Sequence, residues 1–278
     1  MRMTRMAVDA VDLVLGYDSR IAVDRSTFQI PAGGVTAVIG PNGSGKSTLL
    51  NAIADLVDPI AGKLVVTSGR DRLAYVLQTT RVNDALPVTV REVVTMGRYA
   101  TAGAYGRLQA ADHSAVEKAM ARMGITELAS EHLHDLSGGQ RQRVFVAQGL
   151  AQDHDLLLLD EPLTGIDLTT AQAIDDVIHE ETDEGCTVIL TTHDLSEARF
   201  ADFVILLSGR VIAAGLAEEV LTEANLVTAY GPSLLHVERG RVFLDDPAHM
   251  PVDERHTHGE RSIHTESNPG RRHVDHPR

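Results

Sequence analysis

The sequence predicts an α/β protein with a mainly parallel β-sheet, and three observations support this fold class. An apolar run at residues 35–39 leads into a glycine-rich loop and then into a helical pattern. The runs at 156–159 and 186–191 are also apolar, end in polar residues and precede helical patterns. Short continuous apolar runs bounded by turn residues are typical of strands that are buried on both faces of a sheet.

Composition indicates a globular chain that does not depend on nucleic acid. Its 278 residues are enough for one or two domains, and 43% of them are hydrophobic. The formal net charge is −14 and the lysines and arginines form no block, so we expect no nucleic acid as a main partner. The single cysteine, Cys186, excludes an intrachain disulfide and is expected to be a buried strand residue. No apolar run approaches the ~20 residues of a spanning helix, so any membrane part would come from another chain.

The chain opens with two expected strands, near residues 8–15 and 21–30, before a turn at 31–34. Tyr17 lies on the link between these strands. An aromatic ring at this position could stack on a nucleotide base, although the spacing alone favours an ordinary surface tyrosine.

Residues 40–48 form a motif that is specific for phosphate binding. They fit G-x-x-x-x-G-K-[ST] without a mismatch, as Gly40, Pro41, Asn42, Gly43, Ser44, Gly45, Lys46, Ser47 and Thr48. Glycines let successive backbone N–H groups turn towards a phosphate, and the following helix directs its positive dipole end at the same anion. The lysine of this pattern reaches the β- and γ-phosphates, and its hydroxyl residue, Ser47, is placed for Mg²⁺. The alternative is an ordinary glycine–serine turn between a strand and a helix.

The next segments are expected to be helices and short strands. They are, in order, a helix over 46–56, strands over 63–67 and 72–77, a helix after residue 88, a loop or broken helix over 97–106, and a helix over 110–123. Gln78 closes the second strand, and Thr89 with Glu92 forms a potential capping box.

A second glycine motif, Leu136-Ser-Gly-Gly-Gln140, stands before a helical run. Ser137 suits an N-cap with Gln140 at the capping-box position. Gly138 and Gly139 would expose backbone N–H groups to a second anion. A plain helix cap is the alternative.

Acidic residues follow the leucine run at 156–159. Asp160 and Glu161 are expected at the carboxyl end of a central strand, where open α/β sheets bind ligands. Asp160 would hold Mg²⁺ and Glu161 would act as a base toward a water molecule, unless both acids merely cap the next turn. His193 follows the strand at 186–191 at the same edge and could contact a γ-phosphate, although a lone histidine is more often structural.

The C-terminal segments are expected to complete the domain and then lose regular structure. A helix is predicted over 168–183, another with Asp194 as N-cap and Glu197 at its third position, and hairpins over 204–214 and 234–245. Residues 246–278 have almost no apolar content and should be disordered. This tail holds six of the 13 histidines, namely His249, His256, His258, His264, His273 and His276. They could chelate Zn²⁺ weakly, or simply belong to a solvated segment.

In this order the motifs resemble those of the ATP-binding subunits of ABC transporters. The resemblance spans roughly residues 7–230 and rests on residues 40–48, Gln78, 136–140, 156–161, Asp167 and His193. It implies a phosphate-loop NTPase core with a mainly parallel sheet, an antiparallel β subdomain and a helical signature subdomain at about 86–155, all within a domain at 1–245. It also implies that the protein is an ATPase that binds ATP and Mg²⁺.

The same resemblance implies a role for each motif. Residues 40–48 hold the phosphates, and Gln78 contacts Mg²⁺ or the attacking water. Asp160 orients Mg²⁺ and Glu161 is the general base. His193 steadies the γ-phosphate, and Lys46 offsets the negative charge of that phosphate.

Each ATP is implied to lie between two chains. Tyr17 of one subunit would stack on adenine, while residues Ser137–Gln140 of the opposite subunit press on the γ-phosphate. Asp167 would couple the two sites, in a loop that reads Thr164-Gly-Ile-Asp167 where Ser-Ala-Leu-Asp is commoner. The active form is therefore expected to be a head-to-tail homodimer.

Residues 74–107 look like the corresponding segment of manganese, zinc and iron-type metal importers, although Leu77 and Leu86 replace the usual proline and phenylalanine. This similarity implies a polytopic membrane permease as partner and an extracytoplasmic substrate-binding protein as an indirect one. It implies a peripheral location at the cytoplasmic face of the cell membrane. The histidine-rich tail favours zinc as cargo, with manganese next.

Other importers and other classes of ABC protein are alternatives. Siderophore and cobalamin importers share the Pro-Val-Thr-Val…Gly-Arg part of residues 74–107. An exporter often fuses its cassette to membrane helices, and soluble ABC ATPases of translation or DNA repair generally carry two cassettes or long coiled-coil insertions. This chain shows one phosphate loop and a negative charge. No strong histidine or cysteine ligand cluster is expected before residue 246.

Overall fold

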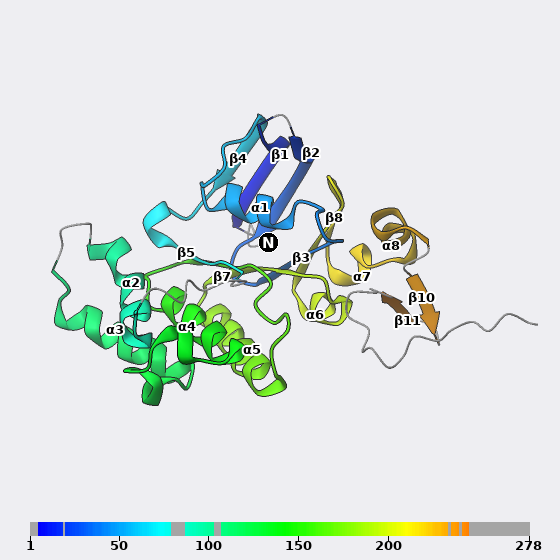
Figure 1. The fold of residues 1–278 in the computed structure, drawn as a ribbon. Helices are drawn as coiled ribbons and strands as arrows, with labels where there is room; N and C mark the ends of the chain where they lie inside the picture. Colours follow the sequence, from blue (N-terminus) through cyan, green and yellow to red (C-terminus); the bar gives the residue numbers. More distant parts are fainter. Residues whose placement is uncertain are drawn as a thin grey trace, which may run out of the picture. The chain divides into compact units, whose positions relative to one another are not determined.

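The protein is organised around a six-stranded sheet with the order β5-β6-β7-β3-β8-β9 (Figure 1). The computed structural model describes residues 5–18, 20–78, 87–102, 107–232, 235–238 and 241–244. The strands are β5 (Leu73–Val76), β6 (Leu156–Leu159), β7 (Thr187–Thr192), β3 (Val35–Ile39), β8 (Phe203–Leu207) and β9 (Val211–Gly215). The first five of these run parallel and only β9 is antiparallel, so the prediction of a mainly parallel sheet is confirmed.

A separate antiparallel sheet has the order β2-β1-β4. It contains β1 (Met6–Tyr17), β2 (Arg20–Pro31) and β4 (Ala61–Val66), the first two longer than their sequence patterns indicated. Helix α1 (Lys46–Ile53) shares one apolar cluster with β1 and with one face of the central sheet. The antiparallel sheet and α1 therefore cover that face together.

Helices cover the opposite face of the central sheet (Figure 1). They include α2 (Val90–Ala102), α3 (Ala110–Arg122), α4 (Gly138–Leu150), α5 (Leu168–Asp183) and α6 (Leu195–Phe200). Short elements follow, namely α7 (Ala217–Val220), α8 (Glu223–Tyr230) and the antiparallel pair β10 (Leu235–Glu238) and β11 (Arg241–Leu244). Single 3-10 turns lie at Arg70–Arg72, Thr126–Leu128 and Leu133–Asp135. The tail predicted for 246–278 lies outside the described residues.

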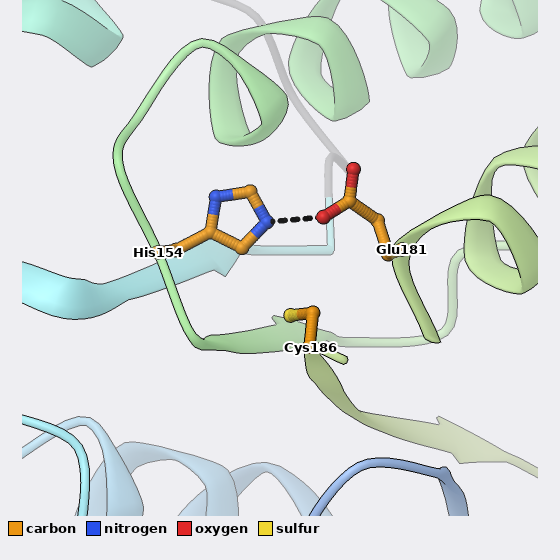
Figure 2. Close-up of side chains that lie close together, drawn as sticks. All are labelled: His154, Glu181 and Cys186. Atoms are coloured by element: carbon orange, nitrogen blue, oxygen red, sulfur yellow. Dashed lines mark hydrogen bonds and ion pairs between the residues drawn. The ribbon is translucent and has the colours of Figure 1, made fainter. Parts of the chain in front are cut away.

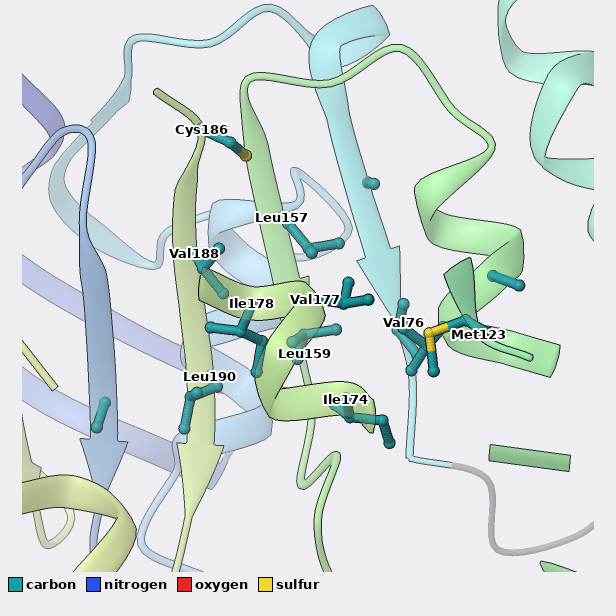
Figure 3. Packing of buried hydrophobic residues seen from close by; sticks show 14 of the residues in the cluster. Val76, Met123, Leu157, Leu159, Ile174, Val177, Ile178, Cys186, Val188 and Leu190 are labelled. Carbon is teal, nitrogen blue, oxygen red and sulfur yellow. The ribbon is translucent and has the colours of Figure 1, made fainter. Parts of the chain in front are cut away.

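The central strands bury both of their faces, as their continuous apolar runs predict. Leu157 and Leu159 of β6 belong to the helix-side cluster, whereas Leu156 and Leu158 belong to the cluster with α1. All four leucines are fully buried. Figure 3 shows Leu157 and Leu159 beside the α5 side chains, which include Val177. Burial of each such side chain contributes about 1.5–3 kcal/mol. Because successive leucines point to opposite faces of the sheet, β6 stabilises the packing of the helices on one face and of α1 on the other.

The loop or broken helix expected at 97–106 is wrong over its first residues, because α2 continues through Gly97 to Ala102. A Cβ on Gly97 would lie 2.2 Å from the backbone oxygen of Gln148 in α4. The glycine therefore permits a close approach of two helices and does not end α2. Residues 103–106 lie outside the described part.

A buried arginine joins α2 to α3 and to the segment that follows α4. Arg98 of α2 donates to Asp112 Oδ1 of α3 at 2.8 Å, and to Asp153 Oδ1 and the Ala151 carbonyl after α4 at 3.0 and 2.8 Å. Its side chain is 7% exposed. Buried guanidinium groups require such partners because an unpaired charge is very unfavourable away from water. Sequence reasoning did not single out this residue.

Among the described helices, none is long and apolar enough to cross a membrane.

Candidate functional site

The site is built at the carboxyl edge of three adjacent strands. Strands β6, β7 and β3 are parallel neighbours, and their registers place Leu159 opposite Leu190, and Ile39 opposite Thr192. The segments that leave these strand ends are residues 40–45, Asp160-Glu161 and His193. The sheet order therefore brings the predicted phosphate loop, acidic pair and histidine to one edge, where open α/β sheets bind ligands.

The loop from β3 to α1 requires glycine at two close approaches. A Cβ on Gly40 would lie 1.9 Å from the Leu207 carbonyl oxygen. Gly45 has φ +104, and a Cβ there would lie 2.7 Å from the Ala22 carbonyl oxygen. Gly43 also has a positive φ, +76. These glycines consequently let the loop curve into the start of α1, as a phosphate-binding loop requires.

Lys46, the first residue of α1, is 5% exposed and directed back over this loop. Its Nζ donates to the Gly40 carbonyl at 2.9 Å and to the Pro41 carbonyl at 3.4 Å, and lies 4.0 Å from Glu161 Oε1. Burial lowers the pKa of Lys46, while the carboxylates of Glu161 and Asp160 act in the opposite direction. The arrangement provides a cation at the mouth of the loop, between backbone and carboxylate.

Hydroxyl groups add donors to the loop. Ser44 is 5% exposed, and its Oγ has no hydrogen-bond partner within the described residues. Buried hydroxyls are nearly always paired, so this orphaned group fits an anion in the loop. Ser47 is exposed, whereas Thr48 is buried in α1. The lysine, the hydroxyls and the glycine-rich backbone at the start of the helix together suit a polyphosphate.

The acidic pair is held by a threonine from the neighbouring strand. Thr191 Oγ1 donates to Asp160 Oδ1 at 2.6 Å and accepts the Glu161 backbone N–H at 2.8 Å. Glu161 has φ +49, an uncommon conformation for a residue other than glycine. Gln78 Nε2 donates to Glu161 Oε2 at 2.8 Å. The structure thus brings Gln78 and Lys46 to the two carboxylate oxygens of Glu161, and the uncommon backbone conformation of Glu161 agrees with a functional site.

Sequence reasoning missed Thr191 as part of this site. The signal was present, because two threonines follow the apolar residues Val188–Leu190 at the end of strand β7. Only the pairing of β7 with β6 shows that the first of them faces the acidic pair.

His193 and the start of α6 follow strand β7. His193 is half-buried directly after β7. Asp194 is the N-cap of α6, as predicted, and accepts from the Ser196 N–H at 2.6 Å. Glu197 is the third residue of α6, also as predicted, and its Oε2 accepts from Thr192 Oγ1 at 2.5 Å. Burial raises the pKa of Glu197, and the Thr192 hydroxyl is the hydrogen-bond partner of this buried carboxyl group.

The second glycine motif forms the predicted helix cap. Ser137 Oγ accepts from the Gln140 N–H at 3.3 Å, and Gln140 Oε1 accepts from the Ser137 N–H at 2.9 Å. A Cβ on Gly139 would lie 2.8 Å from Asp167 Oδ2. Asp167 caps α5, and its hydrogen bonds from Thr170, first from the backbone N–H, lower its pKa. The short distance from Gly139 to Asp167 therefore places residues 137–140 beside the start of α5.

Tyr17 ends β1 with its side chain partly in solvent, at 49% exposure. Its hydroxyl accepts from Asn51 Nδ2 at 3.1 Å, and Asn51 Oδ1 accepts from the Tyr75 hydroxyl at 3.1 Å. Asn51 lies on α1, the helix that follows the phosphate loop. The tyrosine is therefore anchored by its hydroxyl; stacking of its ring on a base stays a prediction.

A strand, a glycine-rich loop and a helix that begins with lysine, beside a strand that ends in Asp-Glu, define a phosphate-loop nucleotide-binding ATPase. Residues 23–164 match the family described as ABC transporter. The chain belongs to this family, as an ATP-binding subunit that hydrolyses ATP.

Relatives and solved structures agree with this membership. The chelated iron transport system membrane protein YfeB of Yersinia pestis is 38% identical over 249 residues, covering 87% of this chain and 84% of its own. The zinc transport system ATP-binding protein TroB of Treponema pallidum is 38% identical, covering 82% and 88%. The manganese transport system ATP-binding protein MntA of Synechocystis is 36% identical, covering 81% and 90%. An inward-facing ABC transporter assigned to the metal-chelate type superposes with a TM-score of 0.73 at 27% identity, covering 86% and 95%.

Proposed function

We propose that the chain is the ATP-hydrolysing subunit of an ABC importer that energises uptake of a transition metal ion. The observation that carries this proposal is the connected group of Lys46, Glu161 and Gln78 beside an intact phosphate loop. Relatives named for transport of zinc, manganese and chelated iron support the cargo class. The chain would act at the cytoplasmic face of the membrane, on a separate polytopic permease.

Residues 40–48 would cradle the phosphates of ATP. The orphaned Ser44 hydroxyl and the backbone N–H groups of the loop would supply donors, and Lys46 supplies a positive charge. Ser47, Gln78 and Asp160 would hold Mg²⁺, because hydroxyl, amide and carboxylate oxygens are the donors that this ion prefers. When bound, Mg²⁺ supplies positive charge against the phosphate oxygens. Tyr17 would support the adenine ring from the end of β1.

Glu161 would act as the general base. Gln78 holds Glu161 Oε2 at 2.8 Å, and Thr191 fixes the backbone of the same residue, so the carboxylate is oriented before a water approaches. Glu161 would take the proton of the attacking water as its oxygen bonds to the γ-phosphorus. Lys46 and His193 would offset the charge that builds on the γ-phosphate oxygens.

Two copies of the chain would share two ATP molecules. Residues Ser137, Gly138, Gly139 and Gln140 of one subunit would contact the γ-phosphate held by the other, through the N–H groups at the start of α4. Because Gly139 adjoins Asp167, the cap of α5, a movement of the signature segment would reach the loop that follows Glu161. This adjacency supports Asp167 as the group that couples the two sites.

Zinc is proposed as cargo ahead of manganese, from the histidine-rich tail. A siderophore, cobalamin or other metal chelate is the second candidate, favoured by the likeness to YfeB and to the metal-chelate type transporter. An extracytoplasmic binding protein would present the cargo to the permease. The permease would contact the chain near Gln78 and residues 80–106, part of which lies outside the described residues.

The test measures cellular metal content in strains that carry an active or an inactive ATPase. The gene is deleted in its host, and copies encoding the wild type, Glu161→Gln or the exposed-site control Glu127→Gln are restored under metal chelation. We expect zinc to fall in the deletion and to recover with the wild type and the control but not with Glu161→Gln. A fall in manganese alone would reverse the order of cargoes. A fall in iron would favour chelate uptake, and unchanged metals would refute metal import.

A further inference from the structure

Three potential metal ligands lie together at the edge of the sheet opposite the phosphate loop (Figure 2). They are His154, between α4 and β6, Glu181, in the last turn of α5, and Cys186, directly before β7. One ligand atom from each lies within 4.8 Å of the other two. Sequence reasoning, which expected no strong histidine or cysteine ligand cluster before residue 246, did not find this group. Sequence distance hid it, because the α4–β6 and α5–β7 connections meet only through the pairing of β6 with β7.

His154 and Glu181 are oriented toward each other by their remaining contacts, while the Cys186 thiol lies 3.5 Å from the Thr187 carbonyl oxygen. His154 Nδ1 lies 2.9 Å from the Gln152 carbonyl, which fixes a proton on Nδ1, and Nε2 lies 2.9 Å from Glu181 Oε2. Arg122 Nη1 donates to the other carboxylate oxygen, Oε1, at 2.5 Å. A histidine that donates one ring nitrogen to a carbonyl and directs the other into a cluster is the usual arrangement of a metal ligand. The His154 and Glu181 side chains are 5% and 6% exposed.

We propose that His154 Nε2, Glu181 Oε2 and Cys186 Sγ form a binding site for Zn²⁺. Tetrahedral bonds of about 2.0–2.3 Å separate ligand atoms by roughly 3.3–3.8 Å. The Nε2–Oε2 pair at 2.9 Å must therefore open by about half an ångström, and the thiol must approach by at most about one and a half. Side-chain rotations of this size leave the strands in place. A thiolate–imidazole–carboxylate set suits zinc and disfavours Mg²⁺, Ca²⁺ and Mn²⁺.

Charge balance is compatible with a divalent cation. Arg122 is hydrogen-bonded to the carboxylates of Glu180 and Glu181, and His154 Nε2 lies 2.9 Å from Glu181 Oε2. Binding through a neutral imidazole and a thiolate releases to solvent any proton held on His154 Nε2 or Cys186 Sγ. The thiolate and the Glu181 carboxylate then offset the two positive charges of the ion. Arg122 stays paired with Glu180 and Glu181 throughout.

The cluster has a route to solvent and room for a fourth ligand. A polar pocket of about 290 Å³ is lined by residues that include His154, Glu181, Arg122 and Gln152. Water from this pocket would complete the coordination. The bound ion would tie the loop before β6 to the end of α5 and the start of β7. This inference does not depend on which ion is transported.

Cobalt substitution of the full chain tests the site directly. Cys186 is the only cysteine among the 278 residues, so a thiolate-to-cobalt charge-transfer band with Co²⁺ must come from it. The histidines of the tail cannot produce that band. We expect the band to saturate at one equivalent of Co²⁺ and to disappear when one equivalent of Zn²⁺ is added. Bound Zn²⁺ should also slow labelling of the thiol by a disulfide reagent at least tenfold.

Variants separate this site from adventitious binding. Cys186→Ser should abolish the band, and His154→Gln should weaken cobalt binding at least tenfold. His179→Gln, an exposed histidine on the same helix as Glu181, should leave both readouts unchanged. Absence of the band in the wild type would overturn the proposal, without depending on whether any variant folds. A band that is equally strong in His154→Gln, or labelling that Zn²⁺ does not slow, would overturn it as well.

Discussion

The hydroxyl of Thr191 organises the acidic pair, so its removal should destabilise the protein and slow ATP hydrolysis. The residue is fully buried, and its Oγ1 joins Asp160 Oδ1 at 2.6 Å to the Glu161 N–H at 2.8 Å. Thr191→Val keeps the shape of the side chain but removes both hydrogen bonds. Thr191→Ser, the matched control, keeps the hydroxyl and removes one methyl group.

The two substitutions should differ by a measurable free energy of unfolding. A hydrogen bond to a charged group contributes about 1.5–3 kcal/mol, and an orphaned buried N–H costs about 1–3 kcal/mol. Thr191→Val should therefore lose about 3 kcal/mol, whereas Thr191→Ser should lose about 1 kcal/mol for its methyl group. For a chain of this size these losses correspond to Tm decreases of roughly 6–12 °C and 2–4 °C.

Thermal unfolding and ATPase assays on the purified full chain provide the measurement. We expect Thr191→Val to lower kcat about tenfold, equal to about 1.4 kcal/mol of transition-state stabilisation, because Glu161 loses its support. ATP affinity should change little, since the phosphate loop is untouched. If Thr191→Val were as stable as Thr191→Ser, the hydroxyl would not carry the two bonds assigned to it. Equal kcat values would refute its positioning role.

Three further predictions concern separate parts of the molecule. Glu161→Gln should leave ATP binding intact and reduce kcat by about 10²–10⁴-fold, and a smaller loss in steady-state turnover would remove this residue as general base. Arg98→Met should lower the free energy of unfolding by about 3–5 kcal/mol, because it leaves the partner carboxylates without their charge partner. Hydrogen bonds lower the pKa of both partner aspartates. The largest cause is the Gln109 backbone N–H for Asp112 and the Arg98 side chain for Asp153. Their contribution is therefore present above the ordinary value of 3.8 and lost as pH falls through the lowered pKa values. Urea unfolding at a series of pH values should show this loss in the wild type and less of it in Arg98→Met; identical profiles would contradict the assignment. Gly97→Ala should lower Tm, because the added Cβ would meet a backbone oxygen of α4 and overpacking costs about 1–3 kcal/mol, whereas Gly138→Ala, where nothing lies within 4 Å, should not. A Gly97→Ala variant as stable as the wild type would show that α2 and α4 separate freely.

Local features of the chain could be predicted because a few neighbouring residues decide them. The glycines of residues 40–45 determine how the backbone can turn, and the serine and glutamine of the second motif form their cap within four residues. Likewise, Leu156–Leu159 had to be a strand buried on both faces, because no polar position interrupts it. Such short-range patterns identified the fold class, the phosphate loop and the acidic pair.

The contacts between these segments were decided only by the tertiary structure. Thr191 lies 30 residues from the acid whose backbone it holds, and His154 lies 27 residues from Glu181. Gly97 was interpreted as a helix breaker because its reason for being glycine is a carbonyl on another helix. The order β5-β6-β7-β3-β8-β9 decides which strand ends become neighbours, and no single segment carries that order. Sequence alone therefore determined the chemical groups of the site, whereas packing of the layers decided which of those groups meet.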